Sequence, residues 1–257
     1  AELEEGPMGH MCEDRFLRRA LLDALGDEPR ITIVEDEVLG QSTSSHGVAL
    51  DLASGQPLSG QLLVGCDGRG SSTATRAGIK RTGWGYGQTA LVAAVEHEQP
   101  HHGIAHQFFM PQGPLAILPL PGNRSSIVWS ETDETAAKFA SLSDGAFLSV
   151  LRPRFGDFLG EIDIKGKRYT YPLGLSLAQS LTAERLVLVG DAAHGVHPLA
   201  GQGLNSGLRD AAALVHVLRD AARRGEDFAS PPVLTRYAQW RRFDIAALAM
   251  VVGRAHV

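Results

Sequence analysis

The chain has 257 residues, of which 44% are hydrophobic and 21% are charged, and its formal net charge is −5. This length allows a sizeable core in one or two domains, and the negative charge argues against a broad nucleic-acid-binding surface. The only cysteines, Cys12 and Cys66, lack metal-site spacing and indicate a reduced compartment rather than a disulfide scaffold. No apolar run reaches the roughly 20 residues of a membrane span. The acidic first residues show no signal-peptide pattern.

The first part of the chain alternates helix and strand signals. Apolar residues at helical spacing predict a helix over residues 13–25. Short strands are predicted at residues 31–35, 48–52 and 62–64, between turns rich in Ser, Gly and Pro. Asp67-Gly68 follows shortly after the last of these strands. An aspartate there can accept hydrogen bonds from a ligand, or it can cap the next helix, which is the more common role.

From Gly83 the pattern becomes that of an antiparallel sheet. Residues 83–88 are predicted as a loop, and strand-like runs at hairpin distances follow at 90–95, 104–110, 115–120 and 125–129. Two short helices are predicted within 132–155, and a returning strand at 169–175. The histidines at 97, 101, 102 and 106 have no supporting carboxylate or cysteine spacing, so we interpret them as solvated or hydrogen-bonded rather than as metal ligands. We expect Phe108 and Trp129 in the core.

The most informative stretch runs from Arg185 to Leu218. Residues 186–189 predict a buried strand, and Asp191 follows at its carboxyl end, where open α/β sheets bind ligands. After a glycine-containing turn, a helix is predicted from about Gln202. Its apolar residues at helical spacing are Leu204, Leu208, Ala211, Ala212, Val215 and Leu218. Backbone N–H groups and the helix dipole favour negative charge at such a helix start. A generic strand–loop–helix unit explains the spacing equally well.

A last helix is predicted over residues 231–252. It carries Tyr237, Trp240, Arg241, Arg242 and Phe243, followed by apolar residues. Basic and aromatic residues beside apolar ones can contact a lipid surface. The alternative, which we favour, is a helix packed on the body of the protein.

Residues 190–210, GDAAHGVHPLAGQGLNSGLRD, resemble the second flavin-binding motif of FAD-dependent aromatic hydroxylases, and most closely that of the ubiquinone-biosynthesis hydroxylases. GWGYGQ, HQFFMPQGP and LPLPGNRSSIVW resemble that family's substrate domain. The resemblance implies an α/β fold with a Rossmann-like FAD-binding domain, incomplete at its N-terminus, and an inserted, mostly antiparallel substrate domain like that of p-hydroxybenzoate hydroxylase. It predicts residues 1–82 as the first part of the FAD-binding domain, 83–175 as the substrate domain, and 176–257 as the second part with the C-terminal helix.

The same resemblance implies which residues contact FAD. Asp191 would bind ribityl hydroxyls and Pro198 would rigidify the loop beside the ring, while Asp67 and Gly68 match a motif beside FAD. The helix entry would meet the flavin edge with Gly201, Gln202, Gly203, Leu204 and Asn205. Arg15 is a further candidate, in Glu-Asp-Arg where the family often has Glu-Asn-Arg. The family usually has an arginine where this chain has Ala74, and Arg76 need not replace it because two helical positions are about 200° apart.

The implied reaction is hydroxylation of the aromatic ring of a polyprenylphenol-type intermediate in ubiquinone biosynthesis, with FAD, NAD(P)H and dioxygen. No catalytic side chain and no metal ligand is predicted, since the cofactor carries the chemistry. The lipophilic phenol implies a cytoplasmic protein with peripheral contact to the inner membrane or to a biosynthetic complex. The family's GxGxxG element is missing, so the chain resembles the interior of a longer protein. A flavoenzyme for another small aromatic, and a non-catalytic fragment or assembly subunit, remain alternatives.

Overall fold

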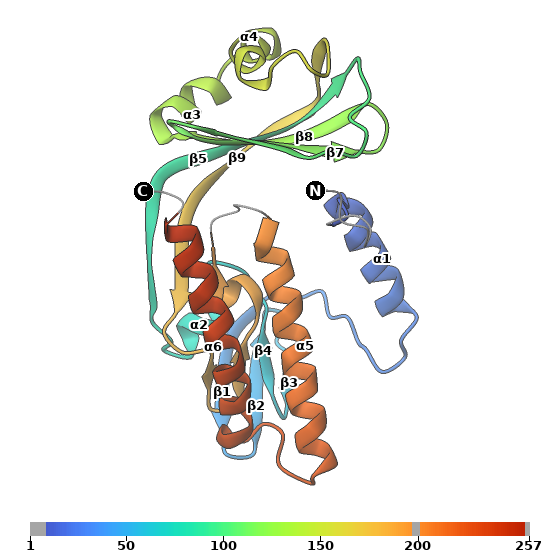
Figure 1. Cartoon of the computed structure of the whole chain (residues 1–257). Coiled ribbons are helices and arrows are strands. Elements are labelled where there is room, and N and C mark those ends of the chain that lie inside the picture. The colour runs from blue at the N-terminus through green and yellow to red at the C-terminus, as the bar shows by residue number, and fades with distance from the viewer. Residues whose placement is uncertain (1–8, 197–200, 255–257) are drawn as a thin grey trace. The chain divides into compact units, whose positions relative to one another are not determined.

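The computed structural model describes residues 9–196 and 201–254, with side chains described as far as residue 245. The chain divides into two compact units (Figure 1). One unit comprises residues 1–33 and 87–173, and the other comprises residues 34–86 and 174–257. Two long strands, β5 (Arg81–His97) and β9 (Ile162–Ala178), continue from one unit into the other.

The unit of residues 34–86 and 174–257 contains two small sheets and two long helices. Strands β1 (Val38–Ser44), β2 (Gly47–Leu52) and β3 (Pro57–Gly60) form an antiparallel sheet. In the second sheet, β11 (Leu186–Leu188) lies between β10 (Thr182–Ala183) and β4 (Leu63–Gly65), and it is parallel to β4. The remaining elements are α2 (Ser72–Arg76), the 3₁₀ turn η1 (Gly190–Ala192), β12 (His194–Gly195), α5 (Gln202–Arg223) and α6 (Pro231–Arg254).

Burial of β11 organises the core of this unit. All three residues of the strand are fully buried, as expected for a short apolar run in a parallel pair covered by helices. Helices α5 and α6 run side by side against it (Figure 1). They contribute Ala213, Leu214, Val217, Ala221, Val233, Tyr237 and Ile245 to the core.

The apolar stripe predicted on α5 is not its buried face. Leu204, Leu208 and Val215 are each more than half exposed. The buried face instead carries Ser206 and Asp210 together with the apolar residues further along the helix. The apolar spacing predicted the wrong face because a periodicity argument counts an aspartate such as Asp210 as a surface position. In the structure Asp210 is buried in a polar network described below.

The other unit is a helix-covered antiparallel sheet preceded by α1 (Asp14–Gly26), in which no residue is buried. The order of the six-stranded sheet is β12-β9-β5-β8-β7-β6, with β6 (His106–Met110), β7 (Gly113–Leu120) and β8 (Arg124–Thr132). Strand β12, the start of β5 and the end of β9 belong to the unit described first. Helices α3 (Asp133–Ala140) and α4 (Asp144–Phe155) cover one face (Figure 1). The core there includes Leu91, Leu115, Ile127, Trp129, Phe147, Leu151 and Phe155. This confirms the predicted mostly antiparallel sheet and the placement of Trp129, while Phe108 is 38% exposed.

Two local predictions were wrong. Residues 31–35 form no strand, and Ile31, Ile33 and Val34 are exposed, because β-branched residues make a strand only where a neighbouring strand pairs with them. Residues 83–88 are part of β5 rather than a loop. A Cβ at Gly83 would lie 2.1 Å from the carbonyl oxygen of Leu175, so the glycine permits close approach of β5 and β9.

No helix within the described part of the chain is long and apolar enough to cross a membrane.

Candidate functional site

Two neighbouring parallel strands each lead into an aspartate. Gly65 at the end of β4 pairs with Leu188 at the end of β11, and Asp67 and Asp191 follow these strands at the same sheet edge. Gly68 (φ 80°) and Gly190 (φ 64°) adopt left-handed backbone conformations that other residues rarely take. The sheet therefore places both aspartates of the predicted site at the edge where α/β sheets bind ligands.

Asp67 is used locally as a helix cap. Its Oδ1 accepts from the Ser71 hydroxyl at 2.6 Å and its Oδ2 accepts from the backbone N–H of Thr73 at 2.9 Å, at the start of α2. Burial acts to raise the pKa of Asp67, but the hydrogen bonds from Ser71 and Thr73 outweigh it and lower the pKa. The carboxylate thus stabilises the Asp67–Thr73 turn beside the sheet edge, the capping role that its sequence position allowed.

Asp191 is held by arginine contacts and stays about a third exposed. Its Oδ2 lies 3.1 Å from Nε of Arg69, whose Nη2 also donates to the carbonyl of Val196 at 2.9 Å. Arg81 donates to the backbone carbonyls of Asp191, at 3.1 Å, and of Ala192, and so fixes the turn itself. Burial lowers the pKa of Arg81, and the nearby carboxylates of Asp191 and Asp67 oppose that shift. Two guanidinium groups therefore determine where the Asp191 side chain can point.

The start of α5 is rich in glycine. Gly201 is the N-cap residue in a left-handed conformation (φ 61°), and among the described residues no side chain caps the first turn. A Cβ at Gly203 would meet nothing within 4 Å, and Leu204 is 59% exposed. The Asn205 side chain donates to the carbonyl of Gly201 at 3.3 Å. The first N–H groups of a 22-residue helix have no intrahelical acceptor, so this end offers donors and a positive dipole to an electron-rich group.

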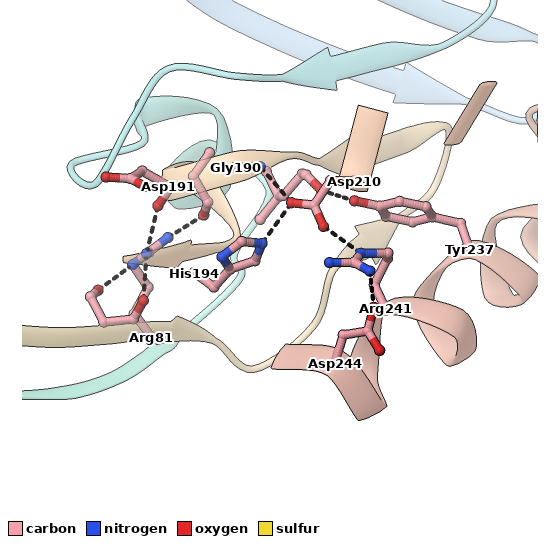
Figure 2. Close-up of polar contacts among 11 residues, drawn as sticks. Arg81, Gly190, Asp191, His194, Asp210, Tyr237, Arg241 and Asp244 are labelled. Carbon is pink, nitrogen blue, oxygen red and sulfur yellow. Dashed lines mark hydrogen bonds and ion pairs between the residues drawn. The ribbon is translucent and has the colours of Figure 1, made fainter. Parts of the chain in front are cut away.

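Behind the turn lies a buried network of charged groups, shown in Figure 2. Asp210 of α5 is fully buried; its Oδ2 accepts from the backbone N–H of Gly190 at 2.8 Å and from Nε2 of His194 at 2.6 Å. Its Oδ1 accepts from Nε of Arg241 of α6 at 2.6 Å, and Arg241 also pairs with Asp244. Burial acts to raise the pKa of Asp210, but the hydrogen bonds from His194, Arg241 and Gly190 lower it on balance. Three groups therefore converge on the two oxygens of the Asp210 carboxylate, from the turn, from His194 and from α6.

Several predicted contacts stay predictions. Pro198 lies outside the described residues. Arg15 belongs to the other unit, where it is exposed and pairs with Glu13 at 2.9 Å. Arg76 donates to the backbone carbonyl of Val38, so it does not take the place of the arginine that Ala74 replaces.

The sequence reasoning missed the groups that hold the predicted site in place. Arg69 and Arg81 carry no local pattern, and Arg241 was considered only as part of a surface patch. Asp210 and His194 stood within the recognised motif without an assigned role. One sequence signal could have indicated the role of Asp210. This acid lies on the same side of the helix as Ala213 and Val217, and a buried acid requires a partner.

Comparison with known proteins identifies the family. The FAD binding domain family matches residues 3–250. The chain belongs to this FAD-binding family. Its relatives include the ubiquinone hydroxylase UbiL of Rhodospirillum rubrum, 46% identical over 93% of this chain and 56% of the relative. The 3-demethoxyubiquinol 3-hydroxylase of Escherichia coli is 34% identical over 95% of this chain and 62% of the relative.

A solved structure supports the fold assignment. PqsL of Pseudomonas aeruginosa, described as a probable FAD-dependent monooxygenase, superposes with a TM-score of 0.77 over 93% of this chain and 68% of that chain, at 22% identity. The FAD-binding fold with an inserted antiparallel sheet is thus confirmed. The chain spans 56% to 62% of the length of the two curated relatives.

The residues present fit FAD as a member of this family would bind it. Asp191 offers a carboxylate acceptor for sugar-alcohol hydroxyls, and the uncapped α5 terminus offers backbone donors for the electron-rich edge of the ring. Gly203 leaves space for a flat group to approach the backbone. The chain therefore offers an acceptor at Asp191 and donors at the start of α5.

Proposed function

We propose that the protein containing this chain is an FAD-dependent monooxygenase that hydroxylates the aromatic ring of a polyprenylphenol-type intermediate in ubiquinone biosynthesis. The observation that carries the proposal is that Asp191, fixed after the end of β11, is followed in the chain by helix α5, whose first turn has no side-chain cap from the described residues. The two ubiquinone-pathway relatives support the substrate class. NAD(P)H as electron donor and dioxygen as co-substrate complete the proposal.

In this proposal FAD, when bound, supplies the redox chemistry that activates dioxygen. The side chains bind and orient the cofactor. Asp191 would accept hydrogen bonds from the ribityl chain, while Arg69 holds the orientation of the carboxylate. The N–H groups at Gly203 and Leu204 donate to the flavin edge where negative charge gathers on reduction. Such preorganised donors cost no rearrangement during the reaction, which is why backbone rather than mobile side chains suits this position.

The direct test is turnover by the full-length protein with FAD. We expect NAD(P)H-dependent oxygen consumption and a hydroxylated product with a prenylated phenol. We also expect a short, water-soluble phenol to compete poorly, because the substrate is lipophilic. Preference for the short phenol would indicate a flavoenzyme for another small aromatic, and absence of bound flavin would indicate a non-catalytic role.

A lipophilic substrate requires delivery from a membrane or a carrier, and we propose peripheral contact for this purpose. Helix α6 packs through one face, with Val233, Leu234 and Tyr237 buried, as we favoured from the sequence. Its other face exposes Trp240 by 49% and Phe243 by 78%. We expect replacement of both by serine to reduce co-sedimentation of the full-length protein with phospholipid vesicles. Unchanged sedimentation would remove this face from the proposal.

A further inference from the structure

The buried network behind the Gly190–His194 turn is more elaborate than packing requires. Asp210 is fully buried, His194 is fully buried, and Arg241 is 2% exposed, next to an otherwise apolar core. Taking charged groups out of water is costly, and an apolar set of similar size packs at least as well. A network of this kind therefore needs an account in terms of what it positions.

The contacts of Asp210 enclose the turn that carries Asp191. One carboxylate oxygen, Oδ2, binds Gly190 at the start of the turn and His194 just after it, at 2.8 and 2.6 Å. Asp191 lies between these two attachment points, so its backbone is fixed from both sides (Figure 2). The other oxygen, Oδ1, is bound by Nε of Arg241, which is itself anchored by Asp244.

Arg241 fixes the orientation of that carboxylate. A carboxylate held at only one oxygen can rotate about its Cβ–Cγ bond, whereas the arginine and the turn together hold both oxygens of Asp210. The guanidinium also compensates the buried negative charge, and Asp210 in return raises the pKa of Arg241 against the opposing effect of burial. Helix α6 thus acts on the turn through one side chain of α5.

We infer that Arg241 and Asp210 form a positioning pair that holds the Gly190–His194 turn in the conformation that FAD binds. Neither residue need touch the cofactor; the pair sets the position of the Asp191 backbone and leaves its carboxylate to Arg69 and the ligand. The inference rests on the proposed FAD site and extends it to the C-terminal helix, which would then influence cofactor affinity from behind the sheet.

A matched control variant separates positioning of the turn from the simple attachment of α6 to the sheet. The Tyr237 hydroxyl, on the same helix, donates to the carbonyl of Leu188 at 2.9 Å, and the side chain is fully buried. Tyr237 therefore ties α6 to β11 without touching the turn. Tyr237→Phe removes one hydrogen bond between α6 and the strand, while Arg241→Met removes the charge and the contact to Asp210 at similar side-chain length.

The experiment measures FAD dissociation constants of the full-length protein by flavin fluorescence, together with thermal stability without FAD. For Arg241→Met we expect affinity to fall by about tenfold or more, since a charge-assisted hydrogen bond to the turn's anchor is lost. Arg241→Lys should be intermediate, because it keeps the charge but lacks the planar donor pair. Tyr237→Phe should lower the melting temperature while leaving affinity within about twofold of wild type.

Amide hydrogen exchange on the cofactor-free protein keeps the inference testable if Arg241→Met folds poorly. In Arg241→Lys we expect faster exchange at Gly190 and across the turn, and in Tyr237→Phe we expect the turn to remain protected. Equal affinity loss in Arg241→Met and Tyr237→Phe, or unchanged exchange of the turn in Arg241→Lys, would overturn the positioning role. Failure of the wild-type protein to bind FAD would instead overturn the proposed function on which the inference rests.

Discussion

At the scale of single residues, the backbone and the side chain of Asp191 are held by different partners. Arg81 and Asp210 hold the backbone of the turn, through the carbonyls of Asp191 and Ala192 and the N–H of Gly190. Arg69 contacts the carboxylate itself. A substitution at Asp191 should therefore remove a ligand contact without loosening the turn.

For Asp191→Ala in the full-length protein, we expect FAD binding to weaken by ~1–3 kcal/mol, because the ribityl hydroxyls and Arg69 lose an acceptor that the bound cofactor would cover. Flavin titration measures the change. Asp157→Ala, at an exposed position in the other unit, is the control and should bind FAD as the wild type does. Unchanged affinity in Asp191→Ala would reject its assignment as a cofactor contact.

Gly203 and Gly207 lie one helical turn apart on α5, and we expect substitution by a larger residue to have different effects at the two positions. A Cβ at Gly203 meets nothing within 4 Å, whereas a Cβ at Gly207 lies 3.4 Å from the Cα of Gly190. We expect Gly203→Val to keep its melting temperature without FAD and to lose flavin occupancy, because the added side chain fills space needed by the ring.

The companion variant Gly207→Val should lose stability before any cofactor is added, because it separates α5 from the turn. Melting temperature and flavin-to-protein ratio, measured for both variants, test the pair. A large stability loss in Gly203→Val with normal occupancy would make Gly203 a structural glycine and remove it from the site.

At the scale of elements, the candidate site includes the N-termini of two helices, α2 and α5, which differ in how they are capped. In helix α2 two of the first backbone N–H groups are already satisfied, that of Thr73 by Asp67 and that of Ala74 by Ser71. Helix α5 has no side-chain cap from the residues that the structure describes. Orphan N–H groups need a partner, so the uncapped helix is the one suited to bind a ligand.

The cap on α2 predicts a pH dependence of stability. The pKa of Asp67 is lowered in the folded protein, so its stabilising effect is complete above the ordinary value of 3.8 and is lost as pH falls through the lowered value. We expect the stability difference between wild type and Asp67→Asn to be constant near neutrality and to shrink in acid. Thermal unfolding of both proteins at several pH values measures it. A difference that persists unchanged in acid would show that the ionised form is not what caps the helix.

At the scale of the whole molecule, our proposal assigns the described residues to the ribityl and flavin end of an FAD site. In the described part of the chain, β4 is an edge strand of its sheet, and Val64 is 39% exposed there. The curated relatives are considerably longer than this chain. The two negative charges of the FAD pyrophosphate require donors, such as a glycine-rich helix N-terminus, that none of the assigned residues provides.

We therefore expect residues 1–257 expressed alone not to retain stoichiometric FAD, and to aggregate through the open sheet edge. The flavin-to-protein ratio after desalting, compared with that of a chain extended upstream through a GxGxxG element, is the measurement. One-to-one retention by the short chain would mean that residues not yet assigned bind the pyrophosphate.

The sequence alone determined the elements whose signals are local. The apolar run of β11, the glycine after it, Asp191 and the helix start near Gln202 are contiguous, and hairpin-spaced strands predicted the antiparallel sheet. These patterns survive in the structure because each depends on neighbours within one turn or one hairpin.

Only the tertiary structure decided which groups hold the site and which faces are buried. Residues 31–35 have strand composition but no partner, and residues 83–88 have loop composition but pair in β5. Asp210 had no assigned role in the sequence, and its partner Arg241 lies 31 residues further along the chain. Partners this distant in sequence leave no periodic signal, because the free energy that buries a charge comes from groups that meet only in the folded chain.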